Sequence, residues 1–171
     1  MYTTFQLIDL LKKKHSIIVH EHDALYTVED SKKLRGKISG AHSKNLFLKN
    51  KKNEFFLLSC EEVDKIDLKK ISKSLELGNV SFAKEQYLDQ YLKIKPGSVS
   101  PFALLNDVNN KVDFYLEQTL YESKFVNFHP LINTFTITIE TNKFIEFMIE
   151  NDKKIHIFST AEEKILRTYG T

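Results

Sequence analysis

The chain has 171 residues, of which 42% are hydrophobic, so it is long enough to bury a core within one domain. Its 25 basic and 23 acidic residues give a net charge of +2, too small to indicate nucleic-acid binding unless the lysines cluster locally. Five glycines and three prolines argue against long flexible linkers, and we expect a single domain over residues 1–171.

The single cysteine, Cys60, excludes an internal disulfide. Because Cys60 ends the apolar run at residues 55–59, we expect a buried structural thiol and not a nucleophile. No stretch approaches the roughly 20 apolar residues that a membrane span needs, and the N-terminus lacks the layout of a signal peptide. We therefore expect a cytoplasmic protein with no membrane partner.

The first part of the chain predicts a helix, a strand and a second, short helix. Thr3 or Thr4 can cap the first helix, whose last turn holds the lysines at 12–14. A β-branched run predicts a strand over residues 17–22, and residues 27–34 are expected to form the short helix.

A turn between two glycines, at residues 36–40, leads into the middle of the chain. Strands at residues 45–49 and 54–59 are expected to form a hairpin, because the connection between them is short. Apolar residues three and four apart then predict an amphipathic helix behind Asp64 or Asp67.

The remainder of the chain mixes helices with strands. Ser81 is expected to cap a helix that Pro96 and Gly97 stop, a helical turn ends at Leu120, and Thr141 caps the last helix. Further strands are expected at residues 102–105, 111–116, 124–128, 135–140 and 155–158. The polar end of the chain is expected to fray.

Strands and helices do not alternate strictly, and several strand pairs have connections of hairpin length. This pattern favours an α+β fold over a doubly wound parallel one. We expect a single mixed domain with a largely antiparallel sheet flanked by helices.

Common catalytic signatures are absent from the sequence. It holds no phosphate-binding P-loop, no GxGxxG, GxSxG or HExxH motif, and no paired CxxC motif. His20 and His22 would share one face of a strand, either as a metal pair or as ordinary surface residues. Since no third ligand follows at a recognisable spacing, we expect neither a metal nor a cofactor.

Three segments place hydrogen-bonding groups on a stiffened backbone, which a preorganised site requires. Residues 42–45 read HSKN and run directly into an apolar strand. Residues 95–102 read KPGSVSPF, where two prolines and a glycine fix a loop that displays two hydroxyls. Residues 127–131 read NFHPL, with a histidine between a strand end and a proline. Taken singly, each segment is more often structural than functional.

Taken in order, the stretches GAHSKNLFLKNKK, KPGSVSPFALLNDVNNKV and FVNFHPLINTFTITI resemble the freestanding prolyl-tRNA editing proteins. These are relatives of the insertion editing domain of bacterial prolyl-tRNA synthetase and of the YbaK family. The resemblance runs from about residue 19 to residue 148 and implies a mixed domain with a curved antiparallel sheet. It also implies hydrolysis of the ester that joins a wrong amino acid to the terminal ribose of tRNA(Pro).

The forms of the motifs resemble the alanine-specific branch of that family more than the cysteine-specific branch, so the resemblance implies Ala-tRNA(Pro) as the substrate. Deacylation of Cys-tRNA(Pro) is the alternative within the family. A non-catalytic tRNA-binding or regulatory module, or a structural domain, is the alternative outside it. The implied partners are the acceptor end of tRNA(Pro) carrying a wrong amino acid and, as a supplier, prolyl-tRNA synthetase. Lysine clusters would then contact the phosphates of the acceptor stem.

The resemblance also implies two sets of site residues. The catalytic set is Lys44, Asn45, Gly97, Ser98 and His129. The substrate-binding set is His42, Ser43, Ser100, Phe102 and Asn127.

The resemblance implies a chemical role for each catalytic residue. Asn45 offers both a donor and an acceptor to the ribose or the carbonyl, and His129 would fix the amino or hydroxyl groups of the substrate. As an ammonium, Lys44 would hold a phosphate, the ribose or the developing negative charge, and acting as a base would require a strongly lowered pKa. Backbone amides around Gly97 and Ser98 are candidates for the oxyanion contacts, since glycine lets a ligand approach the main chain. On an extended strand Lys44 and Asn45 would face opposite sides, so we expect a bend or turn there.

One residue departs from the family pattern. Phe135 places a bulky ring where the family commonly has small residues. It would shrink the pocket if it points inward, or pack in the core, and the apolar alternation along its strand favours the core.

Overall fold

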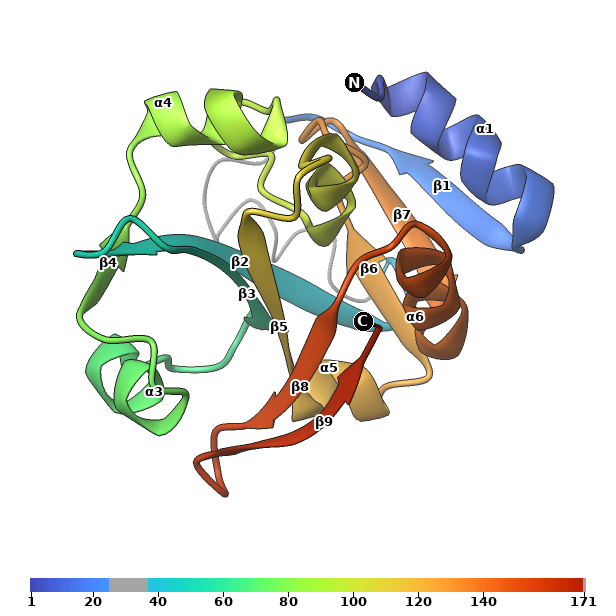
Figure 1. Ribbon diagram of the computed structural model, residues 1–171. Helices are drawn as coiled ribbons and strands as arrows, with labels where there is room; N and C mark the ends of the chain where they lie inside the picture. The colour runs from blue at the N-terminus through green and yellow to red at the C-terminus, as the bar shows by residue number, and fades with distance from the viewer. Residues whose placement is uncertain (25–36, 171) are drawn as a thin grey trace.

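The computed structural model describes residues 1–24 and 37–170, and within them a mixed sheet of nine strands forms the centre of the molecule (Figure 1). The strand order is β1-β7-β6-β2-β3-β5-β8-β9, and β4 pairs with β2. Of the pairings within the described ranges, five are antiparallel, and three (β2 with β6, β3 with β5, β5 with β8) are parallel. The expected α+β fold is confirmed. The short helix expected at residues 27–34 lies outside the described residues.

The strands of the sheet are β1 (Ile17–Glu21), β2 (Ala41–Asn50), β3 (Phe55–Glu61), β4 (Val80–Phe82), β5 (Val112–Glu117), β6 (Phe125–Phe128), β7 (Phe135–Glu140), β8 (Ile155–Ser159) and β9 (Lys164–Tyr169). The helices are α1 (Thr4–Lys14), α3 (Leu68–Ser74), α4 (Glu85–Tyr87), the π-helical turn η1 (Leu88–Leu92), the 3₁₀ helix η2 (Pro101–Asn106), α5 (Gln118–Glu122) and α6 (Thr141–Glu150). None of the helices that the structure describes is long and apolar enough to cross a membrane.

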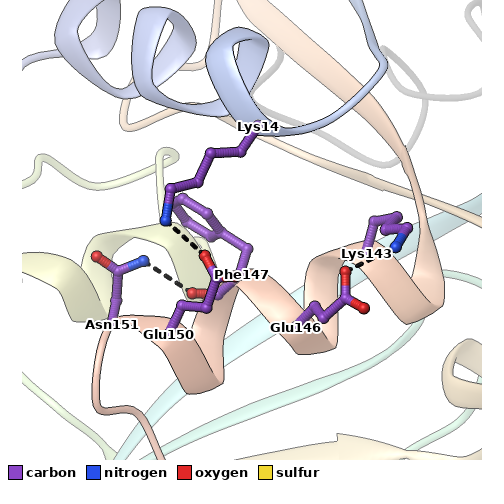
Figure 2. Close-up of polar contacts among 6 residues, drawn as sticks. All are labelled: Lys14, Lys143, Glu146, Phe147, Glu150 and Asn151. Carbon is purple, nitrogen blue, oxygen red and sulfur yellow. Dashed lines mark hydrogen bonds and ion pairs between the residues drawn. The ribbon is translucent and has the colours of Figure 1, made fainter.

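Helix α1 is capped by Thr3, one of the two residues expected to do so, and Thr3 and Gln6 form a capping box. The Thr3 hydroxyl accepts the N–H of Gln6 at 3.3 Å, and the Gln6 side chain accepts the N–H of Thr3 at 2.9 Å. The other end of α1 lies against α6, where Nζ of Lys14 is 2.6 Å from the carboxylate of Glu150 (Figure 2). Both side chains are nearly half exposed, so solvent screens this pair and it adds little to stability.

The main core lies between the sheet and helices α1 and α6, which sit together beside β1, β7 and β6 in Figure 1. Phe144 and Phe147 of α6 are fully buried, and the edge of each ring meets Phe102 of η2 at centroid distances of 5.7 and 6.0 Å. A smaller core, against β3 and β5, is covered by α3 and contains Cys60. Burial raises the pKa of the Cys60 thiol to about 12, so the expected structural thiol is confirmed.

Four expectations about the elements are wrong. Thr141 is the first residue of α6 and not its cap, and its hydroxyl donates to the carbonyl of Ser123. Residues 102–105 belong to a 3₁₀ helix and not to a strand, because the Ser100 hydroxyl caps the N–H of Phe102 and Pro101 sets the first turn. Ser81 caps no helix and lies in β4, paired with β2. Residues 164–169 are not frayed, since β9 pairs with β8 from Lys164 to Tyr169 with one shift in register.

Candidate active site

Strand β2 joins the two halves of the sheet. It pairs in parallel with β6 only at Ala41 and His42, and antiparallel with β3 over residues 43–49. On the β6 side, β4 joins the edge of β2 again at residue 48. Between these partners the edge at residues 43–46 pairs with no strand in the described parts of the chain. We call this stretch of β2 the sheet division, and it holds most of the polar segment that the sequence singles out.

The polar segment is a regular strand, so the bend expected between Lys44 and Asn45 is wrong. Both residues pair in register with β3, Lys44 opposite Cys60 and Asn45 opposite Ser59. Because neighbouring strand residues point to opposite faces, Lys44 lies on the face of the smaller core and Asn45 on that of the main core. His42 shares the face of Lys44. Lys44 and Asn45 can therefore meet one ligand only around the edge of β2, at the sheet division.

The turn that follows β3 holds Lys44. Its Nζ donates to the backbone carbonyl of Asp64 and, at 3.4 Å, to that of Glu62. An ammonium has three N–H donors, so one remains for a ligand. Two carbonyl acceptors suit a positive charge fixed in place, which favours an electrostatic role for Lys44 over a role as a base.

Hydrogen bonds on the other face fix the orientation of Asn45. Its Oδ1 accepts from the Ser59 hydroxyl at 2.6 Å, and its Nδ2 donates to the Ser43 hydroxyl at 3.1 Å. Ser43 in turn donates to the backbone carbonyl of Asn127 at 2.8 Å, which ties β2 to β6. The second hydrogen on Nδ2 of Asn45 is left for a ligand, whereas the hydroxyl of Ser43 is already committed.

Hydrogen bonds hold the side chain of Asn127 between β2, β7 and Ser39, which precedes β2. Its side chain is 3% exposed, and Nδ2 donates to the carbonyls of Ser39 and Ala41 at 2.9 and 3.2 Å. Its Oδ1 accepts from the hydroxyl of Thr138 at 2.5 Å. Both amide hydrogens and the oxygen are used, so the side chain holds the start of β2 against β6, and its substrate-binding role stays a prediction.

We expect Gly40→Ala to lower the free energy of unfolding more than Gly78→Ala does. Both glycines have positive φ, +95° and +74°, which costs a residue with a side chain about 1–2 kcal/mol. At Gly40 an added Cβ would also lie 2.8 Å from the carbonyl oxygen of Phe125 and 3.1 Å from Nδ2 of Asn127, whereas the nearest atom at Gly78 is 3.9 Å away. Overpacking should add about 1–3 kcal/mol at Gly40 alone, measured by urea denaturation. Equal losses would contradict this close approach.

His129 presents an acceptor nitrogen. Its Nδ1 lies 2.8 Å from the carbonyl oxygen of Phe135, which can only accept, so Nδ1 carries the proton and neutral His129 has a lone pair on Nε2. Burial lowers the pKa of His129, and the charge of His22, whose ring centre is 6.1 Å away, lowers it further. The ring therefore stays neutral at neutral pH and can accept a proton or a hydrogen bond.

The polar face of β1 and β7 adds residues that the sequence interpretation did not place in the site. Nε2 of His20 lies 3.0 Å from the hydroxyl of Thr138, and Nε2 of His22 lies 2.9 Å from that of Thr136. The apolar alternation along β7 could have indicated these residues, because it places Thr136 and Thr138 on the face opposite the core. Over residues 1–24 and 37–170, no group of three or more His, Cys, Asp or Glu side chains is placed to hold a metal ion.

The loop before η2 is tied to the core. Ser98 is buried, its N–H donates to the carbonyl of Lys95 at 3.1 Å, and Gly97 between them has φ +84°. Ser100 and Phe102 are fully buried as a helix cap and a core ring, and their predicted substrate-binding roles stay predictions. No hydrogen bond described for residues 37–170 joins this loop to β2, and the oxyanion role of Gly97 and Ser98 stays a prediction.

Phe135 packs against α1. Its ring meets the ring of Phe5 edge to face, with centroids 6.2 Å apart. It therefore lies on the side of β7 opposite Thr136 and Thr138, as the apolar alternation predicts.

Known proteins resemble this chain in sequence and in fold. Residues 22–147 match the aminoacyl-tRNA editing domain family. The chain is 35% identical over 133 residues to the prolyl-tRNA editing protein ProX of Acetoanaerobium sticklandii, covering 77% of this chain and 80% of ProX. It is also 35% identical over 133 residues to prolyl-tRNA synthetase associated domain-containing protein 1 of Xenopus laevis, covering 75% and 79% of the two chains. A crystal structure described as a candidate trans-editing enzyme for prolyl tRNA synthetase superposes with a TM-score of 0.65 at 15% identity, over 91% of this chain and 96% of the other.

The match spans well over half of the sequence, and the chain belongs to the aminoacyl-tRNA editing domain family. Proteins of this family are hydrolases that deacylate aminoacyl-tRNA. The resemblance carried by the three motifs is thereby confirmed.

Proposed function

We propose that the protein hydrolyses Ala-tRNA(Pro), removing alanine that prolyl-tRNA synthetase has attached in error. The family match and the similarity to ProX support editing of prolyl-tRNA. The choice of alanine rests on the forms of the HSKN, PGSVSPF and NFHP segments. The observation that carries the proposal is the placement of Lys44 and Asn45, each with an N–H left for a ligand, at the sheet division.

Hydrolysis of an aminoacyl ester requires an activated water and donors for the tetrahedral oxyanion. Lys44 supplies a fixed positive charge for the developing oxyanion, and Asn45 supplies an amide N–H to the carbonyl or the ribose. Nε2 of His129 accepts a hydrogen bond from the water, a ribose hydroxyl or the amino group of the substrate. Water adds to the carbonyl carbon, the bond to the ribose oxygen breaks, and that oxygen takes up a proton, which releases alanine and tRNA.

Size explains why such an activity is needed. A synthetase pocket shaped for proline cannot strongly reject a smaller amino acid, because a missing methylene is worth only about 1–3 kcal/mol. A second site sized for alanine excludes proline by steric clash, which is a harsher test than the loss of a contact. The two sites in sequence give a selectivity that neither reaches alone.

The acceptor end of tRNA needs contacts beyond the ester. Lys49 lies at the far end of β2, and Lys51 and Lys52 lie in the connection to β3; these lysines are proposed to contact phosphates. Prolyl-tRNA synthetase is the proposed supplier of the mischarged substrate. The cytoplasm is the proposed compartment, since tRNA is charged there.

Incubation with Ala-tRNA(Pro), Cys-tRNA(Pro) and Pro-tRNA(Pro) tests the proposal. We expect the alanyl ester to be lost faster than the prolyl ester by more than about tenfold, because proline is sterically excluded. The measurement is the amount of labelled ester that survives over time, with buffer hydrolysis subtracted. Preferential loss of the cysteinyl ester would assign the protein to the other branch. Tight tRNA binding with no accelerated hydrolysis would instead make it a binding module.

A further inference from the structure

A chain of side-chain hydrogen bonds crosses the sheet from β1 to the start of β2. It begins at His20 on β1, passes to Thr138 on β7 at 3.0 Å, and reaches Asn127 on β6 at 2.5 Å. From there it ends on the backbone carbonyls of Ser39 and Ala41, which lie on both sides of Gly40. It therefore links the first strand of the sheet to the residues that lead into His42 and Lys44.

The direction of every bond in this chain is determined. The two carbonyls can only accept, so the end of the Asn127 side chain that faces them is its amide nitrogen. Its oxygen then accepts the single hydrogen of the Thr138 hydroxyl. The hydroxyl has no second hydrogen, so at its contact with His20 it accepts, and Nε2 of His20 donates. The neutral ring is thus the tautomer protonated on Nε2.

We propose that His20 is a positioning residue for the deacylation site, acting through Thr138 and Asn127 to fix where β2 begins. The backbone position of residues 39–41 sets the position of Lys44 and Asn45 further along the same strand. The inference rests on the proposed function, because it concerns the efficiency of that site.

Burial and close packing support this role. Thr138 and Asn127 are 4% and 3% exposed, so their polar atoms depend on partners within the protein, and loss of the His20 donor leaves the Thr138 hydroxyl with one hydrogen bond fewer. Burial and the neighbouring His22 and His42 lower the pKa of His20, which keeps its ring neutral at neutral pH. Gly40 packs so closely against Phe125 of β6 that an added Cβ would lie 2.8 Å from its carbonyl oxygen. The start of β2 therefore cannot shift toward β6.

Enzyme kinetics on the full chain give the first test. We expect His20→Ala and Thr138→Val each to lower kcat for Ala-tRNA(Pro) about three- to tenfold, the size expected for one neutral hydrogen bond, with KM little changed. The double variant should be no worse than either single one, because both changes break one chain. His20→Gln, whose amide nitrogen can replace Nε2 as the donor, and Thr138→Ser should restore most of the activity.

A matched control is present in the far half of the sheet. His156 on β8 pairs with Thr168 on β9 through a similar contact of 2.9 Å, remote from β2 in the strand order. His156→Ala should therefore leave kcat unchanged. A loss in His156→Ala equal to that in His20→Ala, losses that multiply in the double variant, or a His20→Gln as defective as His20→Ala would each overturn the proposal.

Nuclear magnetic resonance gives a test that does not depend on activity. In the wild-type protein the ¹⁵N shifts of His20 should identify the tautomer protonated on Nε2, and the side-chain amide protons of Asn127 should exchange slowly with solvent. That protection should be lost in His20→Ala and kept in His20→Gln. The other tautomer, or unchanged protection in His20→Ala, would overturn the inference. If the wild-type protein hydrolyses none of the three esters, the proposed function fails while this measurement still decides the hydrogen-bond chain.

Discussion

Replacing Lys44 with methionine is expected to lower kcat for deacylation about 100- to 1,000-fold, the usual cost of removing one group that stabilises an oxyanion. Methionine keeps the length and the apolar stem of the side chain and removes only the charge and the donors. The ammonium is fixed by the carbonyls of Glu62 and Asp64, so it acts without reorganising during the reaction. Single-turnover hydrolysis of Ala-tRNA(Pro) measures the effect.

Lys49→Met is the matched control for this variant. Lys49 is on the same strand but on the opposite face, so its loss should alter tRNA affinity at most. Lys44→Arg, which keeps the positive charge, should recover part of the activity if charge is the important property. Wild-type turnover in Lys44→Met, with a normal thermal melt, would show that the assignment of Lys44 is wrong.

Phe102→Ala is expected to lower the free energy of unfolding by about 3–5 kcal/mol, the cost of emptying the space of a fully buried aromatic ring. The ring of Phe102 meets those of Phe128, Phe144 and Phe147 edge to face, so the vacated space cannot close without moving β6 and α6. Urea denaturation followed by circular dichroism measures the change.

Phe5→Ala supplies the comparison for Phe102→Ala. Phe5 is 67% exposed, and its replacement should cost less than about 1 kcal/mol. The pair also decides between two roles for Phe102. If Phe102→Ala were as stable as the wild type but weakened substrate binding, the residue would be a pocket contact, as the family resemblance implies, and not a core residue.

Local signals in the sequence account for the elements that were predicted correctly. Thr3 and Gln6, three residues apart, indicate the cap of α1. The apolar pattern that follows Thr141 indicates the start of α6. Where the signals conflicted, the prediction failed. The apolar run at residues 102–105 suits a strand or a buried helix, and only the Ser-Pro pair before it indicates the helix that forms.

The last strand was missed for a different reason. Most residues of β9 are exposed, so no apolar pattern in the sequence indicates a strand. The strand forms because its backbone pairs with β8. Pairing of this kind depends on a partner strand and leaves little trace in the sequence of the strand itself.

The sequence indicated which segments form the candidate site, but not how their side chains contact one another. The resemblance led to Lys44, Asn45 and His129, and it also implied substrate contacts for Asn127 and Phe102, whose side chains are 3% and 0% exposed. His20 could not be connected to Asn127 from sequence, because their link exists only through the strand order β1-β7-β6. Knowledge of that order is needed before the role of any of these polar residues can be stated.

The hydrogen bonds around β2 also determine when the site can exist during folding. Ser43 bonds to a residue 84 positions away in the sequence, and His20 to one 118 positions away. Such long-range contacts require extensive loop closure and form late, whereas α1 and the β2–β3 hairpin depend on neighbours in the chain. We therefore expect a partly folded or partly synthesised chain to have no deacylase activity. Under the proposed function, correctly charged tRNA would then not meet a half-formed site that hydrolyses esters without discrimination.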